Sequence, residues 1–498
     1  MNILDIIDNI KVKTIYGNLP ESVNNISQDS RKVGEGDVFV AIKGYTVDGH
    51  NYIEKVIEQG AALVIASRYE NYDVENCAVI VIKEHEIEKI ASMIAKKINE
   101  GSDVHTVAVT GTNGKTSIST LVHNMLRNLG ESSAYIGTNG FGKNDAEPVY
   151  FGNTTPDVVT LHNQIGELRR DNIKNLAFEA SSHAMALGRI YNVDIDVAIF
   201  TNLTHEHLDF HGDMQTYAYD KSLLFSTLGN NLSEAKYGVL NKDDSYYKTI
   251  SKCLYQQEIN YSIKDENADF YAYNIRQYKE GKVYKTSFTL NSPEGTFECT
   301  TNYIGDFMVS NVLAALIAVW IKGYSVEQLV DILPKLGALY GRMEILGDDL
   351  PIDIISDFAH TPDGYEKLLE ATREMRKGKR TLLVTGMGGG RDISKGPLIG
   401  EIISEADYVV ITTDSPRDED VEVLMESIEK GMTHKNYEKV WFRTDAVKRI
   451  IELSEPGDVV ILASKGREDY EILQGGKKVW HSDPIVAVEE AKKKFNIK

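Results

Sequence analysis

Apolar residues recur along this chain with two different spacings, and their alternation outlines an α/β protein. Short, largely apolar runs occur at 37–44, 61–67, 107–110, 175–180, 196–202, 381–386, 407–414 and 458–464. Between them, segments such as 51–60 and 310–324 show apolar residues at helical spacing. Runs that are apolar throughout are typical of strands buried on both faces of a mainly parallel sheet. The pattern therefore predicts α/β layers rather than an all-helical or all-strand protein.

The chain of 498 residues is too long for one hydrophobic core, and two changes of pattern predict where it divides. Polar residues 99–102 interrupt the apolar pattern, and a new α/β series begins after 338–346. Residues 262–299 alternate between polar and apolar, which predicts antiparallel strands appended to the central part. We therefore expect three domains, at 1–101, 102–338 and 339–498.

Composition and charge limit the compartments in which this protein would work and the kinds of partner that it would bind. No apolar run approaches the ~20 residues that span a bilayer, and the N-terminus lacks the pattern of an export signal. Cys77, Cys253 and Cys299 are too few and too widely spaced for a disulfide framework, which favours a reducing compartment. A net charge of -20 repels nucleic acid and anionic membranes. We expect a cytoplasmic monomer that binds small molecules through local basic groups.

A glycine-rich segment between a predicted strand and a predicted helix has the context of a phosphate loop. Its backbone N–H groups would cradle phosphate, Lys115 would neutralise the β- and γ-oxygens, and the Thr116 hydroxyl would suit magnesium. Val109 stands at the first glycine position of the longer pattern, which leaves G-x-x-G-K-T. The predicted nucleotide-binding residues are Gly111, Thr112, Asn113, Gly114, Lys115, Thr116 and Ser117.

Acidic and histidine residues follow the next two predicted strands. Glu179 ends one strand in EASSH, and NLTHEHLDFHG closes the other, so both reach the sheet edge where α/β proteins bind ligands. One carboxylate with nucleotide oxygens is sufficient for magnesium, and a second ion near His207 would complete the site. His205, His207 and His211 also leave a zinc site as a weaker alternative. Lys221, taken alone, would be interpreted as a solvated surface lysine.

Taken together, several blocks resemble one known family in content and order. They are TGTNGKTS, NTTPD, EASSH, NLTHEHLDFHGDM with a lysine shortly after it, YGRMEI, DFAHTPDG and ASKGRE. The chain resembles the Mur ligases from ISQDSR near residue 27 to HSDP near 481, and most of all the members that act third in the peptide-adding series. The resemblance implies a small N-terminal α/β domain, a central phosphate-loop mononucleotide-binding sheet and a C-terminal Rossmann-like α/β domain.

The implied reaction is ATP-dependent formation of an amide through an acyl phosphate, in synthesis of the cell-wall precursor. The acceptor would be UDP-N-acetylmuramoyl-L-alanyl-D-glutamate, the cofactors would be ATP and Mg²⁺, and carbon dioxide would be carried as a carbamate on Lys221. A build-up of negative charge on the acyl phosphate suits preorganised cations rather than a protein nucleophile.

The resemblance also implies a role for individual residues. Catalysis falls to Lys115, His207 and Lys221, and metal binding to Thr116, Glu179, His207 and the carbamylated Lys221. Further nucleotide contacts fall to Asn311, Arg342, Asp357 and His360. The UDP-linked substrate would contact Ser30, Arg31, Thr154, Thr155, Ser181 and Arg189. The amino acid would contact Arg391, Asp414, Ser415, Pro416, Arg417, Ser464 and Glu468.

Two signals conflict over which amino acid is added. Arg417, in D-x-P-R, resembles enzymes that add meso-diaminopimelate, because a guanidinium pairs well with a second carboxylate. The block ASKGRE instead resembles lysine-adding members. We expect L-lysine, with meso-diaminopimelate as the alternative. The chain also departs from the family pattern at Glu206, where Asp is usual, at Met308, where Asn is more common, and at GGGRD, where GGDRD is more common.

Two other functions remain open at this point. A folylpolyglutamate-type ligase would use the same chemistry on another acceptor, but QDSR and GYTVDGHNY near the N-terminus resemble a UDP-sugar domain. A nucleotide-switched regulator would release phosphate whether or not an acceptor is present. An inactive homologue is disfavoured, because Lys115, Glu179, His207 and Lys221 are all present.

Overall fold

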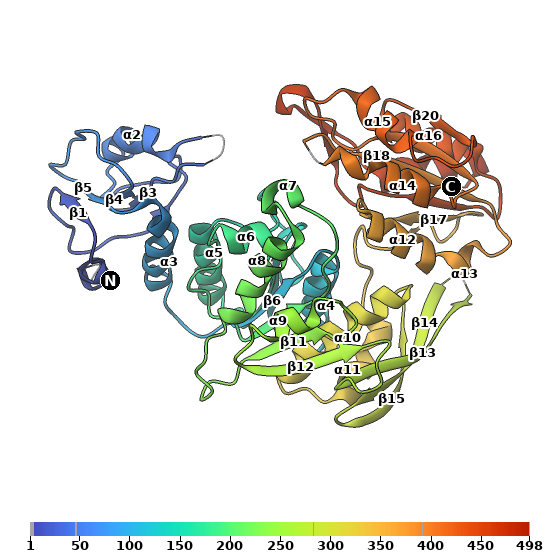
Figure 1. The fold of residues 1–498 in the computed structure, drawn as a ribbon, viewed down its shortest axis with the longest axis horizontal. Coiled ribbons are helices and arrows are strands. Elements are labelled where there is room, and N and C mark those ends of the chain that lie inside the picture. Colours follow the sequence, from blue (N-terminus) through green and yellow to red (C-terminus); the bar gives the residue numbers. More distant parts are fainter. Residues whose placement is uncertain (1–3, 45–46, 282, 391, 498) are drawn as a thin grey trace.

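Three main sheets follow one another along the chain in the computed structural model, which describes residues 4–44, 47–281, 283–390 and 392–497 (Figure 1). The first sheet consists of β1 (Thr14–Tyr16), β2 (Ile26–Ser27), β3 (Val38–Val40), β4 (Leu63–Ala66) and β5 (Ala78–Val81), in the order β1-β5-β4-β3-β2. Its helices are α1 (Leu4–Asn9), α2 (Ile53–Glu58) and α3 (Ile87–Ile98). Neighbouring strands are parallel except β1 with β5.

The central sheet has a parallel middle. Its strands are β6 (His105–Thr110), β7 (Ser133–Gly137), β8 (Gly140–Lys143), β9 (Asn175–Glu179), β10 (Val197–Phe200), β11 (Tyr237–Asn241) and β12 (Gln257–Ser262), in the order β12-β11-β10-β6-β9-β7-β8. Only β8 pairs antiparallel within this part. The phosphate-loop segment therefore starts from β6, near the middle of the sheet, where ligands of such folds bind.

Helices cover both faces of this sheet. One face carries α4 (Lys115–Asn128), α10 (Asp306–Ile321) and α11 (Val326–Ile332). The other carries α5 (Val158–Arg170), α6 (Ser182–Ala186), α8 (Met214–Ser226) and α9 (Tyr247–Ser251), with the short α7 (Leu208–His211) beside them. Strand β6 is apolar throughout because both of its faces are covered by helices. Val107 and Val109 pack against the helices of the first face, and Ala108 packs against those of the second.

The polar, alternating segment extends the edge of the central sheet, as predicted. It forms β13 (Phe270–Glu280), β14 (Val283–Ser292) and β15 (Gly295–Thr301). These strands pair antiparallel with one another, and β13 joins the sheet beside β12. One side of β14 is buried and the other is partly open, which explains its alternating sequence.

The third sheet is again mainly parallel. Its strands are β16 (Glu344–Leu346), β17 (Asp353–Ser356), β18 (Thr381–Met387), β19 (Tyr408–Thr413), β20 (Tyr437–Lys439) and β21 (Val459–Leu462), in the order β16-β17-β21-β18-β19-β20. One face packs against α12 (Pro362–Ala371), α13 (Arg373–Arg376), α14 (Gly396–Ile403) and α15 (Val421–Glu429). The other packs against α16 (Arg443–Leu453) and α17 (Asp483–Phe495). A small hairpin consists of β22 (Tyr470–Ile472) and β23 (Lys478–Trp480).

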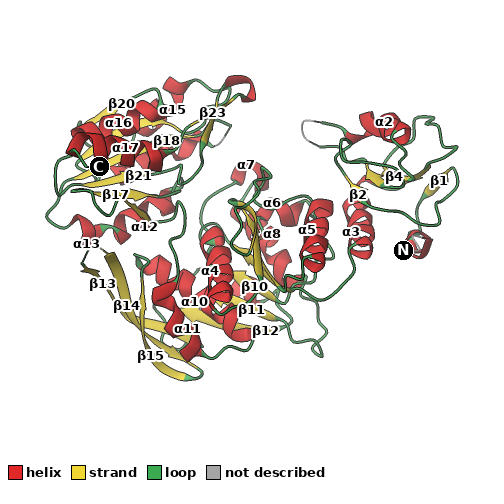
Figure 2. Cartoon of the chain, turned by 180° about the vertical axis from the view of Figure 1, so that it is seen from behind, coloured by secondary structure: helices red, strands yellow, loops and turns green. Residues whose placement is uncertain are grey.

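Specific contacts connect the three parts. On one side, α3 packs against α5, and Asn99 donates a 2.8 Å hydrogen bond to Asn163. On the other, Figure 2 shows β13 and β14 reaching toward α13. There Lys279 and Tyr284 bind the carboxylate of Asp353 at 3.2 and 2.8 Å.

The structure confirms the predicted fold class of a central α/β sheet flanked by two other α/β parts. The domain boundaries at residues 101 and 338 stay predictions. Within the described residues, no helix has both the length and the apolar character of a membrane span.

Candidate active site

The phosphate loop joins β6 to α4 at the carboxyl edge of the central sheet. A side chain at Gly111 would overlap the next strand end, because its Cβ would lie 1.8 Å from Thr201 Oγ1. Gly114 caps α4 with a left-handed φ of +91°. The loop therefore places backbone N–H groups beside the positive end of a four-turn helix, an arrangement that binds phosphate.

Lys115 folds back over this loop. Its ammonium donates to the carbonyl oxygens of Gly111 at 2.9 Å and Thr112 at 2.8 Å. Burial lowers the pKa of Lys115, and the nearby charge of Glu179 opposes that change. The side chain thus lies where the sequence predicts a partner for phosphate oxygens.

Glu179 ends β9 and is only 1% exposed. Its Oε1 accepts a 2.8 Å hydrogen bond from the Thr138 backbone N–H, and its Oε2 accepts one from the Thr138 hydroxyl at 3.3 Å. Gly137 leaves room for the carboxylate, since a Cβ there would lie 2.1 Å from Oε1. Sequence reasoning missed Thr138, and no motif marks it.

Lys221 points from α8 to the sheet edge and is 1% exposed. Its Nζ donates to the Gly111 carbonyl at 2.8 Å and lies 4.6 Å from the centre of the Tyr217 ring. Burial, with the charge of Lys115 as a second cause, lowers the pKa of Lys221 well below its ordinary value. Lys221 is therefore not the solvated surface lysine that its local sequence, taken alone, would suggest.

His207 lines the same cavity as this lysine and has a left-handed φ of +56°, which is unusual for a residue other than glycine. Its ring lies 4.9 Å from that of His183. Both ring nitrogens of the nearby His211 already have hydrogen-bond partners: Nδ1 lies 2.7 Å from Asp220 Oδ2, and Nε2 lies 2.9 Å from Ser182 Oγ. No group of three or more His, Cys, Asp or Glu side chains in the described part of the chain is arranged to hold a metal ion, so zinc gains no support.

Two residues just before His207 in the chain carry a buried side-chain oxygen, and one of them, Glu206, lines the same cavity as His207. Among the residues that the structure describes, Glu206 Oε2 and Thr204 Oγ1 have no hydrogen-bond partner. Glu206 Oε1 lies 3.3 Å from Lys395 Nζ, and both side chains are 10% exposed. Magnesium is commonly held by one or two carboxylates together with water and phosphate oxygens. The oxygen-rich surroundings therefore fit Mg²⁺ better than a metal that needs a full protein cage.

The segment after the central domain reaches back to the phosphate loop. Arg342 donates to Thr116 Oγ1 at 3.1 Å, and its guanidinium lies 4.5 Å from the centre of the Phe358 ring. Asn113 donates to Asp363 Oδ2 at 2.7 Å. The C-terminal domain thus contacts the loop at two points.

The other predicted nucleotide residues are held by their own surroundings. Asp357 accepts hydrogen bonds from the Met343 and Ala359 N–H groups, each at 2.7 Å, and burial raises its pKa. His360 Nδ1 lies 2.9 Å from the Phe358 carbonyl oxygen.

The departure at Met308 has a structural explanation. Asn311 donates to Met308 Sδ at 3.6 Å, and Met308 is buried. Across this contact, a Cβ on Gly114 would lie 2.7 Å from Asn311 Oδ1, so the amide oxygen packs against the phosphate loop. Met308 therefore supports Asn311 from within the helix rather than lining the site.

Four residues predicted for the UDP-linked substrate cluster near Glu179. Thr155 Oγ1 donates to the Glu179 carbonyl at 2.7 Å, and Arg189 donates to the Thr155 carbonyl at 2.9 Å. Thr154 and Ser181 belong to the same cluster. The other two, Ser30 and Arg31, lie in the N-terminal domain, where Arg31 binds Asp29 at 2.8 Å.

The residues predicted for the amino acid gather at the carboxyl ends of β19 and β21. Ser415, Arg417 and Ser464 all have left-handed φ values, of +52°, +54° and +80°. Asp414 and Glu468 lie in the same two loops. Such strained residues cluster at functional sites. Arg391 falls outside the described residues.

One cavity of about 740 Å³ joins most of these groups. Its walls include Lys115, Glu179, His207 and Lys221 from the central domain, and Asp414 and Glu468 from the C-terminal domain. Predicted residues that the structure describes but that do not line it are Gly111, Ser30, Arg31, Thr155, Arg189 and Pro416.

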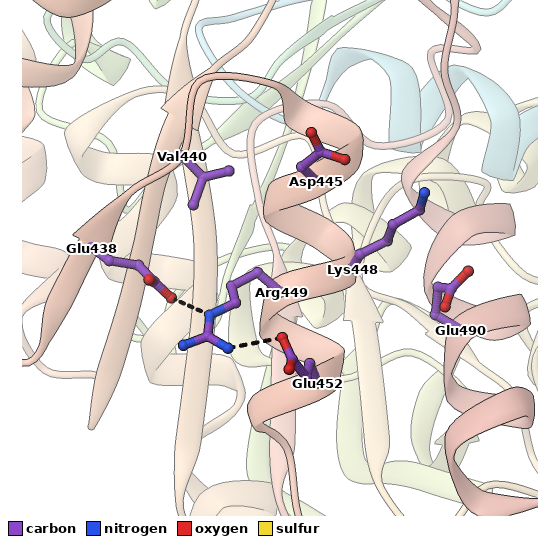
Figure 3. Close-up of a pocket in the computed structure, with 7 residues that line it drawn as sticks. All are labelled: Glu438, Val440, Asp445, Lys448, Arg449, Glu452 and Glu490. Carbon is purple, nitrogen blue, oxygen red and sulfur yellow. Dashed lines mark hydrogen bonds and ion pairs between the residues drawn. The ribbon is translucent and has the colours of Figure 1, made fainter.

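A second hollow, of about 440 Å³, lies between β20, α16 and α17 and shares no described lining residue with this cavity (Figure 3). Three of its charged residues pair with one another, as Arg449 binds Glu438 and Glu452 at 2.8 Å each.

The fold and the site define a phosphate-loop enzyme in which nucleotide and other substrates meet between the central and C-terminal domains. Models of three domains match the chain: the Mur ligase family catalytic domain at 22–101, the Mur ligase middle domain at 109–319 and the Mur ligase glutamate ligase domain at 341–466. The chain belongs to the Mur ligase family, and it is therefore an ATP-dependent, ADP-forming amide ligase of peptidoglycan precursor synthesis.

Individual relatives extend this similarity over the whole chain. The UDP-N-acetylmuramoyl-L-alanyl-D-glutamate--L-lysine ligase of Staphylococcus haemolyticus is 42% identical over 497 residues, covering 99% of each chain. A solved UDP-N-acetylmuramoyl-L-alanyl-D-glutamate--2,6-diaminopimelate ligase matches 99% of each chain at 28% identity, with a TM-score of 0.68. The MurF ligase of Thermotoga maritima, solved with ADP, is 19% identical, covers 95% of this chain and 97% of its own, and shares the fold with a TM-score of 0.64.

Proposed function

We propose that this protein joins L-lysine to UDP-N-acetylmuramoyl-L-alanyl-D-glutamate at the expense of ATP. The observation that carries the proposal is one cavity in which Lys115, Glu179 and Lys221 meet Asp414 and Glu468. The first three residues suit phosphate and metal, and the last two suit the ammonium groups of a diamino acid. The name of the Staphylococcus haemolyticus relative supports the same acceptor and the same amino acid.

The proposed reaction has two steps. The γ-phosphoryl group of ATP passes to the substrate carboxylate, giving an acyl phosphate and ADP. The amine then bonds to the carbonyl carbon, the bond to phosphate breaks, and the amine loses a proton. Lys115 and the backbone N–H groups at the start of α4 would offset the negative charge that builds up on the phosphoryl oxygens.

Thr116, Glu179 and His207 would hold Mg²⁺. When bound, Mg²⁺ acts as a Lewis acid that draws negative charge from phosphoryl oxygens. Glu206 lines the same cavity and has one carboxylate oxygen without a partner in the described structure, which supports this assignment.

We also propose a carbamate on Lys221. Its depressed pKa favours the uncharged amine, which is the form that adds carbon dioxide and releases a proton. The product would replace a buried cation with anionic oxygens beside Gly111, and so give the metal site one more oxygen ligand.

The choice of L-lysine rests on how Arg417 is held. Its NH1 group donates to the Gly389 carbonyl, and its backbone N–H donates to Ile472 at 2.9 Å. The guanidinium is thus tied to the pocket wall, while Asp414 and Glu468 supply negative charge for a second ammonium group. Meso-diaminopimelate is the second candidate, because Arg417 still lines the cavity.

The remaining assignments are proposed on the same basis. Arg342, Asn311, Asp357 and His360 would contact the nucleotide, and Ser30 and Arg31 would bind the UDP part of the acceptor if the N-terminal domain closes over it. The monomeric state and the cytoplasmic location also stay predictions.

The test is phosphate release from ATP with UDP-N-acetylmuramoyl-L-alanyl-D-glutamate, comparing L-lysine with meso-diaminopimelate and following the nucleotide product by mass. We expect release that depends on L-lysine. A preference for meso-diaminopimelate would keep the ligase and correct the amino acid. Release without any acceptor would favour a nucleotide-switched regulator, and activity only with a folate acceptor would favour a folylpolyglutamate-type ligase.

A further inference from the structure

A lysine of the C-terminal domain is buried between two carboxylates of the proposed amino-acid pocket. Lys465 is 0% exposed, and its Nζ lies 3.0 Å from Asp414 Oδ1 and 3.5 Å from Glu468 Oε2. Asp414 follows β19 and Glu468 follows β21, so this one ammonium group connects two separate strand ends. Lys465 itself is not among the described residues that line the cavity.

Each carboxylate keeps one oxygen for a ligand. Within the part of the chain that the structure describes, Lys465 is the hydrogen-bond partner of one oxygen of Asp414 and one of Glu468, and Asp414 Oδ2 and Glu468 Oε1 have none. Both carboxylate side chains line the cavity. The cavity wall thus presents two carboxylate oxygens, and Lys465 holds each carboxylate in place through its other oxygen.

The charges explain why this arrangement needs a cation. Burial and the charge of Asp414 raise the pKa of Glu468, whereas Lys465 and Arg417 act in the opposite direction. Burial by itself lowers the pKa of Lys465, but the two carboxylates raise it overall, so the side chain stays an ammonium. Without it, two neighbouring carboxylates would repel each other and one would take up a proton.

A second buried pair holds the backbone that carries Lys465. Arg443 donates to Ser464 Oγ at 3.0 Å and to the Ala463 carbonyl at 2.6 Å. Asp483 binds Arg443 at 2.5 Å and His481 at 2.6 Å, and the side chains of all three are fully buried. Ser464, with its φ of +80°, is therefore fixed in a conformation that it would rarely adopt by itself.

We propose that Lys465 is a positioning residue for the amino-acid substrate: its ammonium sets the spacing of Asp414 and Glu468, so that their free oxygens receive the ammonium groups of the incoming diamino acid. The inference rests on the proposed ligase function and adds a residue that touches no substrate. Lys465 belongs to the ASKGRE block, in which the sequence analysis assigns roles only to Ser464 and Glu468.

The test replaces Lys465 by methionine, which keeps most of the length of the side chain and removes its charge. In K465M the KM for L-lysine should rise by at least about 10-fold, because the two carboxylates lose their shared partner. The KM values for ATP and for the UDP-linked acceptor, and kcat at saturating L-lysine, should change by less than about 2-fold. An unchanged KM for L-lysine in folded K465M, or a parallel loss in all four constants, would overturn the proposal.

A matched control exists in the same domain. Lys439 also lies between two carboxylates, those of Glu422 and Glu429, but it does not belong to the described lining of the cavity. K439M should leave the KM for L-lysine at the wild-type value. If K439M raises it as much as K465M does, loss of any paired lysine has this effect and the proposal is wrong.

A second variant covers the case in which K465M does not fold. K465R keeps the charge, but its wider guanidinium cannot hold the two carboxylates at the same spacing. It should fold and raise the KM for L-lysine by about 3-fold or more; a wild-type KM would then refute the positioning role. The wild-type enzyme separates the two hypotheses, because absence of amino-acid-dependent phosphate release there would contradict the proposed function itself.

Discussion

The ammonium of Lys221 lies 2.8 Å from the carbonyl oxygen of Gly111, the first glycine of the phosphate loop. A side chain that we propose as a metal ligand is thus in contact with the loop that would hold the phosphates. Its neighbour Tyr217 and the surrounding helices exclude it from solvent.

The first prediction concerns this lysine. K221A should lower kcat by about 100-fold or more, because a preorganised charge at the phosphoryl group is lost. A small carboxylate such as formate should restore part of the activity by taking the place of the carbamate. Steady-state kinetics with and without formate provides the check, and full activity of K221A would disprove the carbamate assignment.

The second prediction concerns the proposed metal site, which a substitution at Gly137 can disturb without removing any proposed ligand. In G137A the new Cβ would lie 2.1 Å from Glu179 Oε1, so the carboxylate must move. The Mg²⁺ concentration for half-maximal activity should rise by about 10-fold, as is common when the support of a metal ligand is changed. Gly337 is a suitable control, because no described residue other than its two chain neighbours lies within 4 Å of a Cβ added there. Equal Mg²⁺ requirements in G137A and G337A would argue against Glu179 as a ligand.

The third prediction separates the two candidate amino acids. If the Arg417 guanidinium only holds the cavity wall together and does not bind substrate, R417A should keep kcat/KM for L-lysine within about 5-fold of wild type. No substrate carboxylate would then lose its partner. The comparison is kcat/KM for L-lysine and for meso-diaminopimelate. A loss of about 100-fold with the preferred amino acid would show that the guanidinium binds the substrate directly.

The fourth prediction concerns stability. D483N leaves the fully buried Arg443 without its anionic partner, which should lower the free energy of unfolding by about 3–5 kcal/mol. Urea unfolding followed by circular dichroism would measure it. As a control, E452Q breaks only the exposed pair with Arg449 and should leave the unfolding curve unchanged. Similar curves for the two variants would mean that the buried pair contributes little.

The fifth prediction is a dependence of stability on pH. Burial lowers the pKa of both His123 and His162 to about 4, against an ordinary value of about 6.5. Between these values the unfolded chain binds more protons than the folded one, so stability rises with pH through this window and is lost on acidification. From pH 7 to pH 5 each histidine should remove about 2 kcal/mol from the free energy of unfolding. H162N should show a shallower loss over this interval in urea unfolding, and a slope equal to that of wild type would contradict the assignment.

Sequence patterns predicted the α/β layers and the phosphate loop because both depend on local regularities. An unbroken apolar strand such as β6 must be covered on two faces, and Gly111 and Gly114 mark backbone that side chains would obstruct. The antiparallel strands β13–β15 were also predictable from their alternation. Residues such as Lys221 were interpretable only through the family resemblance, since nothing near it in sequence indicates burial.

Other features depend on contacts between distant segments, which no local pattern carries. Thr138 reaches Glu179 across the sheet edge, and Met308 supports Asn311 where the sequence alone suggested a disturbed contact. Lys465 lies in a recognised block, but its burial between Asp414 and Glu468 follows from the pairing of β19, β18 and β21. The sequence left undetermined the order of the strands and the existence of several strands outside the apolar runs, such as β7, β8 and β20.

The three cysteines make the protein suitable for site-specific labelling. Burial raises the pKa of Cys77 and of Cys299 to about 12, so both thiols stay protonated and shielded at neutral pH. Cys253, between α9 and β12, is partly exposed. A maleimide dye should therefore attach to the central domain at this position, and one cysteine added to the C-terminal domain would give a dye pair whose energy transfer reports the distance between the domains.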